Sequence, residues 1–135
     1  MEKRDICCLV AEDDAELRDL LNRILTKEGF TVVLAENGLK GCELLKTRKD
    51  VQLVITDIRM PEKNCVALLR EGLDMNPNLK IILITAFGEV EEYLETMNIG
   101  AFEYLNKPFK MNDFLQVVSR AVESLEKDES IPPSL

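Results

Sequence analysis

Short apolar runs alternate with segments of helical periodicity along this chain. Five runs have the length and the β-branched content of strands: residues 6–11, 31–35, 51–56, 80–85 and 102–106. Between and after them, apolar residues recur every three or four positions, in residues 14–29, 37–48, 64–75, 89–99 and 114–125. This alternation predicts an α/β fold: a doubly wound, five-stranded parallel sheet with five helices.

Capping residues mark the ends of several predicted helices. Asp14, Asn37 and Asn64 stand where a side-chain oxygen can accept from the first free backbone N–H groups. Gly29 ends the first helix, and Gly100 occupies a position suited to a left-handed C-cap. We expect one domain over residues 1–127, followed over 128–135 by a frayed tail or the start of a linker.

The length and the charge of the chain exclude some classes of function. The 135 residues, 46% of them apolar, are enough for one buried core without metals or disulfides. Lys and Arg number 17 against 25 Asp and Glu, which gives a net charge of -8. Such a charge repels nucleic-acid phosphates, so we expect no direct DNA or RNA binding by this domain.

The cysteines do not indicate a metal site. Cys7, Cys8, Cys42 and Cys65 show no Cys-x-x-Cys spacing, and the chain has no histidine to complete a zinc site. We expect them to behave as small apolar residues in a reducing cytoplasm. The first apolar run is too short for a signal peptide or a membrane span, so no membrane association is expected.

Polar residues that suit phosphoryl chemistry follow the predicted strands. With the strand order 2-1-3-4-5, which is taken from known doubly wound sheets, the carboxyl ends of the strands meet at one edge. Glu12 and Asp13 follow the first strand, Asp57 ends the third, Thr85 ends the fourth, and Lys107 follows the fifth. The sequence therefore predicts that these side chains form one site.

Clustered carboxylates repel one another and attract a hard cation that prefers oxygen ligands. Mg²⁺ suits Asp13, Asp57 and a water-bridged Glu12, with the backbone carbonyl of Arg59 as a further ligand. Asp57 would be the nucleophile that forms an acyl phosphate.

Two further side chains would bind the transferred phosphoryl group. Thr85 would donate a hydrogen bond to one of its oxygens, and Lys107 would pair with another. We also expect the Lys107-Pro108 peptide to be cis, because a sharp turn is needed to direct the lysine inward.

Residues 5–126 resemble the receiver domain of two-component response regulators. The matching segments are Leu9-Val10-Ala11-Glu12-Asp13-Asp14, Asp57-Ile58-Arg59-Met60-Pro61, Ile84-Thr85-Ala86 and the stretch from Gly100 to Phe109. The resemblance implies that Asp57 accepts a phosphoryl group from a histidine kinase or phosphotransfer protein. It implies also that Glu12 and Asp13 are the acid pair, that Lys107 binds phosphate, and that Thr85 and Tyr104 are the switch pair.

The resemblance further implies a signalling domain that catalyses its own phosphorylation and dephosphorylation. Phosphorylation would change the face formed by helix four, strand five and helix five, which would contact an output domain, an effector or a second copy of the domain. In this family the positions of Arg59 and Phe87 tune hydrolysis of the acyl phosphate, so the resemblance, together with the bulk of these residues and their lack of a carboxylate or amide, implies slow autodephosphorylation. Transcriptional regulators and hybrid kinases are the expected settings. The chain departs from the family in the loop after Pro61, where Glu62, Asn64 and Cys65 replace the usual glycines and acidic residue.

Two other functions compete with this one. An aspartyl-nucleophile phosphohydrolase usually needs a second aspartate two residues after the first, where this chain has Arg59. A receiver-like interaction module would work without phosphorylation. Each residue also has an ordinary structural role, because acids before a helix are often caps and a strand-terminal aspartate is often a turn residue.

Overall fold

The structure is a computed structural model. It describes residues 6–57, 65–85 and 97–130, and for 65–67 and 128–130 it describes the backbone only. The predicted cap Asn64, the carbonyl of Arg59 and the side chain of Phe87 therefore lie outside the described residues.

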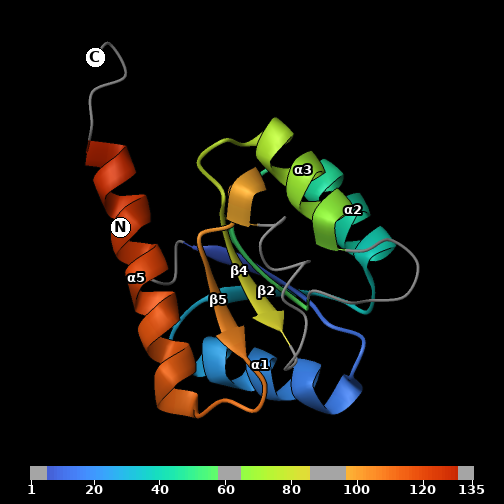
Figure 1. Ribbon diagram of the computed structural model, residues 1–135, viewed down its shortest axis with the longest axis vertical. Coiled ribbons are helices and arrows are strands. Elements are labelled where there is room, and N and C mark those ends of the chain that lie inside the picture. Colours follow the sequence, from blue (N-terminus) through green and yellow to red (C-terminus); the bar gives the residue numbers. More distant parts are fainter. Residues whose placement is uncertain (1–5, 58–64, 86–96, 131–135) are drawn as a thin grey trace.

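A five-stranded parallel sheet forms the centre of the molecule (Figure 1). Its strands are β1 (Cys7–Ala11), β2 (Thr31–Ala35), β3 (Val51–Asp57), β4 (Lys80–Thr85) and β5 (Glu103–Asn106). They lie in the order β2-β1-β3-β4-β5, and every neighbouring pair is parallel. The predicted fold class and strand order are confirmed.

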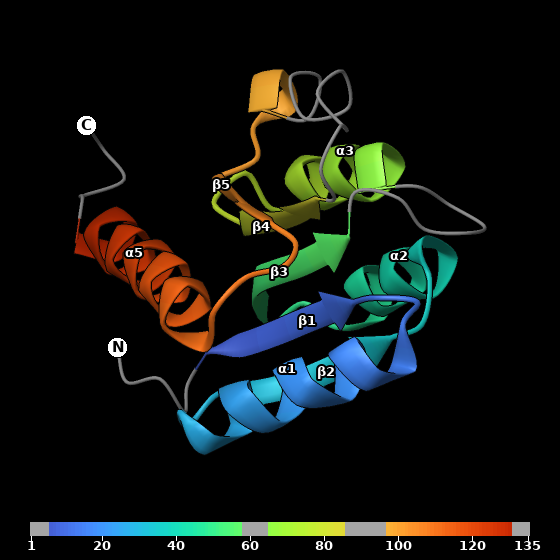
Figure 2. The ribbon, with the colours of Figure 1, turned by 60° about the horizontal axis from the view of Figure 1, so that its bottom comes forward.

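Helices cover both faces of the sheet. They are α1 (Ala15–Lys27), α2 (Gly38–Thr47), α3 (Cys65–Met75) and α5 (Met111–Ser130). Figure 2 shows α1 and α5 on one side of the sheet and α2 and α3 on the other. The described residues 97–99 are also helical, and the rest of the helix expected over 89–99 lies outside the described residues.

The two helical layers bury two separate hydrophobic cores. Cys8 and Val10 of β1 point into the core shared with α1 and α5, whereas Cys7 and Leu9 point into the core shared with α2 and α3. Because both faces are covered, β1 is buried at every position and reads in sequence as a continuous apolar run. Cys7, Cys8 and Cys42 are buried and form no disulfide with one another, in agreement with the apolar role expected of them.

The predicted caps of the described helices are present. Asp14 Oδ1 accepts from Glu16 N at 2.9 Å, and Asn37 Oδ1 accepts from Lys40 N at 2.8 Å. Gly29, with φ 101°, has the positive φ that glycine adopts without strain and follows α1 as predicted.

Helix α5 continues to Ser130, and the rest of the segment expected to be a frayed tail or the start of a linker lies outside the described residues. Among the described helices, none combines the length and apolar character needed to cross a bilayer.

Candidate functional site

The register of the sheet brings the carboxyl ends of four strands together. Ala11 pairs with Thr56, which places Glu12 beside Asp57. Thr85 pairs with Asn106, so Lys107 follows directly at the same edge. The side chains predicted to form a site thus come from one edge of the sheet.

Three carboxylates gather at this edge. One oxygen each from Glu12, Asp13 and Asp57 lies within 4.8 Å of the others. Glu12 is 0% exposed and Asp57 6%, whereas Asp13 is exposed. The cluster therefore has two buried members and one member open to solvent.

Backbone contacts hold Glu12 in place. Its N–H donates to Ala35 O at 3.0 Å, which extends the β1–β2 pairing by one residue. Its carbonyl oxygen accepts from Arg18 Nη1 at 2.8 Å. Sequence reasoning did not identify Arg18, because an arginine inside a helix carries no signal that it contacts a strand end.

Lys107 connects the two buried carboxylates. Its Nζ lies 2.5 Å from Asp57 Oδ2 and 3.2 Å from Glu12 Oε1. The Lys107-Pro108 peptide is cis, as predicted. Phe109 stacks on buried Phe114 with 5.9 Å between ring centroids, which attaches the lysine loop to α5.

The electrostatics of the cluster follow from burial. Burial first, and interaction with the Asp57 carboxylate second, raise the pKa of Glu12 to about 7, although Lys107 acts to lower it. Burial by itself would lower the pKa of Lys107, but its hydrogen bonds and ion pairs with Asp57 and Glu12 outweigh burial and raise it.

The residues present fit a divalent cation. Glu12 Oε2 is buried and has no hydrogen-bond partner among the described residues. When all three carboxylates of the cluster are ionised, one ammonium leaves two negative charges uncompensated. An orphaned carboxylate oxygen beside other oxygen ligands suits Mg²⁺, which takes few carboxylates and completes its octahedron with waters.

Thr85 is buried, with 3% of its surface exposed. Its hydroxyl donates to Asn106 Oδ1 at 2.7 Å, a contact that sequence reasoning did not predict. Tyr104, the other member of the predicted switch pair, is 38% exposed in β5 and pairs with Leu83.

A shallow cleft of about 570 Å³ borders the cluster. Leu17 and Leu20 of α1 form one wall, and Lys107, Pro108 and Phe109 contribute another.

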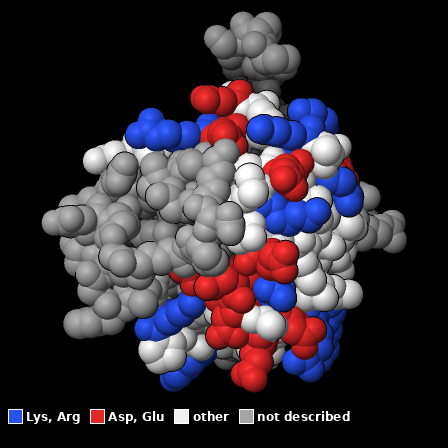
Figure 3. Space-filling view, turned by 90° about the vertical axis from the view of Figure 1, so that its right-hand side faces the viewer, with Lys and Arg blue, Asp and Glu red and all other residues white. Residues whose placement is uncertain are grey.

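Acidic side chains gather over the lower part of the face shown in Figure 3. The exposed acids Asp13, Asp14 and Glu16 stand where β1 leads into α1, and Asp13 is itself a member of the carboxylate cluster.

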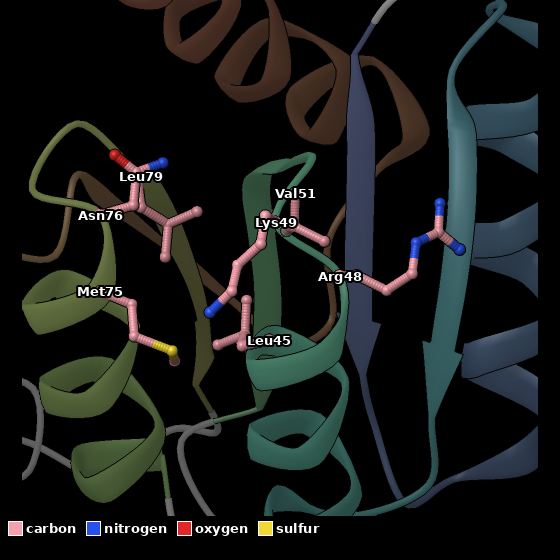
Figure 4. A pocket seen from close by; sticks show the side chains of 8 residues that line it. Leu45, Arg48, Lys49, Val51, Met75, Asn76 and Leu79 are labelled. Carbon is pink, nitrogen blue, oxygen red and sulfur yellow. The ribbon is translucent and has the colours of Figure 1, made fainter.

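A second pocket, of about 180 Å³, lies at the opposite end of the sheet (Figure 4). It lies where α2 and α3 end and β3 begins, and its lining includes Leu45, Arg48, Val51 and Met75. Because Val51 begins the strand that Asp57 ends, this pocket is separated from the carboxylate cluster by the length of β3.

Residues 8–119 match the family model described as the response regulator receiver domain. Among curated proteins, the chain is 36% identical over 115 residues to the Escherichia coli transcriptional regulatory protein GlrR, covering 85% of this chain and 26% of GlrR. It is 32% identical over 120 residues to the E. coli DNA-binding transcriptional regulator NtrC, covering 89% of this chain and 25% of NtrC. The chain thus spans about a quarter of the length of these relatives.

Solved structures of related proteins have a similar fold. A response regulator receiver domain protein from Clostridium thermocellum superposes with a TM-score of 0.84 at 26% identity, covering 93% of this chain and 99% of the other. NtrX from Brucella abortus gives a TM-score of 0.84 at 28% identity, covering 91% of this chain and 28% of NtrX.

Proposed function

This chain belongs to the family of response regulator receiver domains of two-component systems, and we propose that Asp57 is its phosphoacceptor. The observation that carries the proposal is the position of the Asp57 carboxylate, at the end of β3, next to the Lys107 ammonium and to two further carboxylates. A carboxylate held there can act as a nucleophile next to a group that neutralises charge.

The proposed reaction is a phosphoryl transfer from a phosphohistidine. An Asp57 oxygen attacks phosphorus, the P–N bond breaks, and the imidazole keeps the bonding electrons and takes up a proton. Lys107, now paired with Asp57 at 2.5 Å, then pairs with a phosphoryl oxygen, because the acyl phosphate carries more negative charge than the free carboxylate did. Thr85 donates its hydroxyl to another phosphoryl oxygen.

Glu12, Asp13 and Asp57 would hold the Mg²⁺, with the backbone carbonyl of Arg59 as a further oxygen ligand. When bound, the ion would supply positive charge beside the phosphoryl oxygens. Buried Glu12 contributes the orphaned oxygen, and exposed Asp13 leaves one side of the cluster open to water.

We propose that the phosphodonor, a histidine kinase or phosphotransfer protein, docks in the cleft beside Lys107. Leu20 is 41% exposed there, and Leu17 and Phe109 line the same cleft. Apolar side chains next to the acceptor allow a partner to bury surface while its phosphohistidine approaches Asp57.

We propose that phosphorylation acts on the output through Thr85 and Tyr104. Movement of Thr85 toward the phosphoryl group lets Tyr104 turn inward from its exposed position, which changes the surface formed by the fourth helix, β5 and α5. That surface would contact an output domain, an effector or a second copy. The regulators GlrR and NtrC, of which this chain spans about a quarter, favour a transcriptional output.

Acetyl phosphate and Mg²⁺ test the acceptor. We expect intact mass to show one labile phosphoryl addition in the wild type and none in Asp57→Asn or in the absence of Mg²⁺. Continuous turnover of the donor without a stable addition would support the phosphohydrolase instead. No addition to the folded wild type would support a module that works without phosphorylation.

Slow autodephosphorylation is part of the proposal. Arg59 and Phe87 would hinder a water that approaches the acyl phosphate. We expect the addition to persist for minutes or longer after the donor is removed, and decay within seconds in Mg²⁺ buffer would contradict this.

A further inference from the structure

Thr85 and Asn106 occupy the last positions of two neighbouring strands. They are Cα partners in the β4–β5 pairing, and Thr85 Oγ1 donates to Asn106 Oδ1 at 2.7 Å. Thr85 is 3% exposed, whereas Asn106 is exposed to solvent. The buried hydroxyl is therefore satisfied by a side chain at the surface of the domain.

A hydroxyl carries one proton, so it donates to one strong acceptor at a time. While Thr85 donates to Asn106, that proton is not available to a phosphoryl oxygen on Asp57. The two acceptors compete for the same hydrogen bond.

The backbone restricts how Thr85 can respond. Its carbonyl accepts from Lys107 N at 2.7 Å, which ties the end of β4 to the residue after Asn106. With the main chain held, rotation of the Thr85 side chain is the movement that remains. The contact with Asn106 is the one that this rotation must break.

We propose that Asn106 is a positioning residue that holds Thr85 in the unphosphorylated conformation and thereby restrains phosphorylation. The proposal rests on the proposed function, because it takes Thr85 as a ligand of the phosphoryl group. A charged phosphoryl oxygen is a stronger acceptor than an amide oxygen, so the bond transfers once Asp57 is phosphorylated. Asn106 thus sets how readily the domain responds to a donor.

The test is a double-mutant cycle between Asn106→Ala and Thr85→Val, with the rate of acyl phosphate formation from acetyl phosphate in saturating Mg²⁺ as the readout. Loss of a neutral hydrogen bond corresponds to a rate increase of about threefold to tenfold for Asn106→Ala in the Thr85 background. In the Thr85→Val background we expect no increase. Asn112→Ala, an exposed asparagine at the start of α5, is the matched control and should leave the rate unchanged.

A second readout needs no phosphorylation. Three-bond couplings to the Thr85 methyl group report its χ1 rotamer in the Mg²⁺-free protein. We expect a single rotamer in the wild type and in Asn112→Ala, and rotamer averaging in Asn106→Ala.

Different results would contradict the phosphoacceptor role of Asp57 and the restraining role of Asn106. If the wild type gains no addition that Asp57→Asn lacks, the phosphoacceptor proposal is wrong, and the couplings alone decide whether Asn106 holds Thr85. An unchanged or slower rate in Asn106→Ala, with normal phosphorylation of Asp57, overturns the restraining role. An unchanged rotamer overturns it as well.

Discussion

Lys107 Nζ lies 2.5 Å from Asp57 Oδ2, although 50 residues separate the two along the chain. The same ammonium lies 3.2 Å from Glu12 Oε1, so one cation is shared by both buried carboxylates. The lysine supplies positive charge at carboxylate oxygens that a divalent ion would also bind. Lysine and cation therefore compete for the same oxygens.

Replacing Lys107 with alanine should tighten Mg²⁺ binding. The substitution removes a positive charge beside the ion and releases two carboxylates, for an expected gain on the order of tenfold in affinity. Isothermal titration calorimetry at fixed ionic strength measures it. Lys110→Ala, which removes an exposed lysine of the same loop, should leave the affinity within about twofold. Weaker binding in Lys107→Ala would mean that the lysine orders the site instead of competing for it.

The raised pKa of Glu12 predicts how stability depends on pH. Burial, followed by interaction with the Asp57 carboxylate, raises the pKa of Glu12 in the folded protein from its ordinary value of 4.5 to about 7. Between these values the folded state binds the proton more tightly than the unfolded state. The contribution of Glu12 to the free energy of unfolding is therefore fully present below pH 4.5 and is lost as pH rises to about 7.

Urea unfolding from pH 5 to pH 8 without Mg²⁺ measures this effect as the difference between the wild type and Glu12→Gln. We expect the variant, which stays neutral, to gain stability relative to the wild type as pH rises through this range. Glu16→Gln, an exposed acid of α1, controls for the loss of one surface charge and should show no such trend. Parallel pH profiles for wild type and Glu12→Gln would refute the assignment.

Asp13 and Asp14 are adjacent, but we expect their substitutions to affect different properties. Asp14 accepts from Glu16 N and Leu17 N, so Asp14→Ala should lower the free energy of unfolding by about 1 kcal/mol through loss of the α1 cap. Asp13→Ala should leave that free energy nearly unchanged without Mg²⁺, because the side chain is exposed, and should weaken Mg²⁺ binding. Thermal unfolding with and without Mg²⁺ separates the two. If Asp13→Ala lowered the stability and Asp14→Ala weakened Mg²⁺ binding, Asp13 would be the cap and Asp14 the metal ligand.

Two helix-interior glycines should respond differently to alanine. A Cβ at Gly41 in α2 would lie 3.4 Å from its nearest neighbour, Leu68 Cδ1, which is ordinary contact. A Cβ at Gly72 in α3 would lie 2.9 Å from Leu79 Cδ2 and 3.3 Å from Leu45 Cδ1. Gly41→Ala should raise the free energy of unfolding by about 0.5–1 kcal/mol, because alanine favours the helix more than glycine does. The free energy of unfolding of Gly72→Ala should lie about 1–3 kcal/mol below that of Gly41→Ala, because its Cβ overpacks the core.

Denaturant unfolding at one pH compares the two variants directly. Equal stability would show that Leu79, although buried, moves aside at no cost.

Sequence pattern was sufficient for the sheet because its strands are buried on both faces. Strand β1 is buried at all five positions, and so it appears as an uninterrupted apolar run. The sequence pattern of β5 is weaker, because its four residues alternate between partly buried and exposed positions. In the structure this strand begins at Glu103, one residue later than predicted. Short edge strands carry little periodic signal, whereas local capping oxygens such as that of Asp14 act within three residues and are readable directly.

Taken alone, the sequence determined which chemical groups are present and at which strand ends they stand, because those properties are local. The tertiary structure decided which of them touch. Residues 12 and 107 are 95 positions apart, and the hydrogen bond from Lys107 to Glu12 depends on how β1, β3, β4 and β5 are aligned. The burial that raises the pKa of Glu12 and the bond between Thr85 and Asn106 arise in the same way, from strand register, which fixes distances that no stretch of sequence contains.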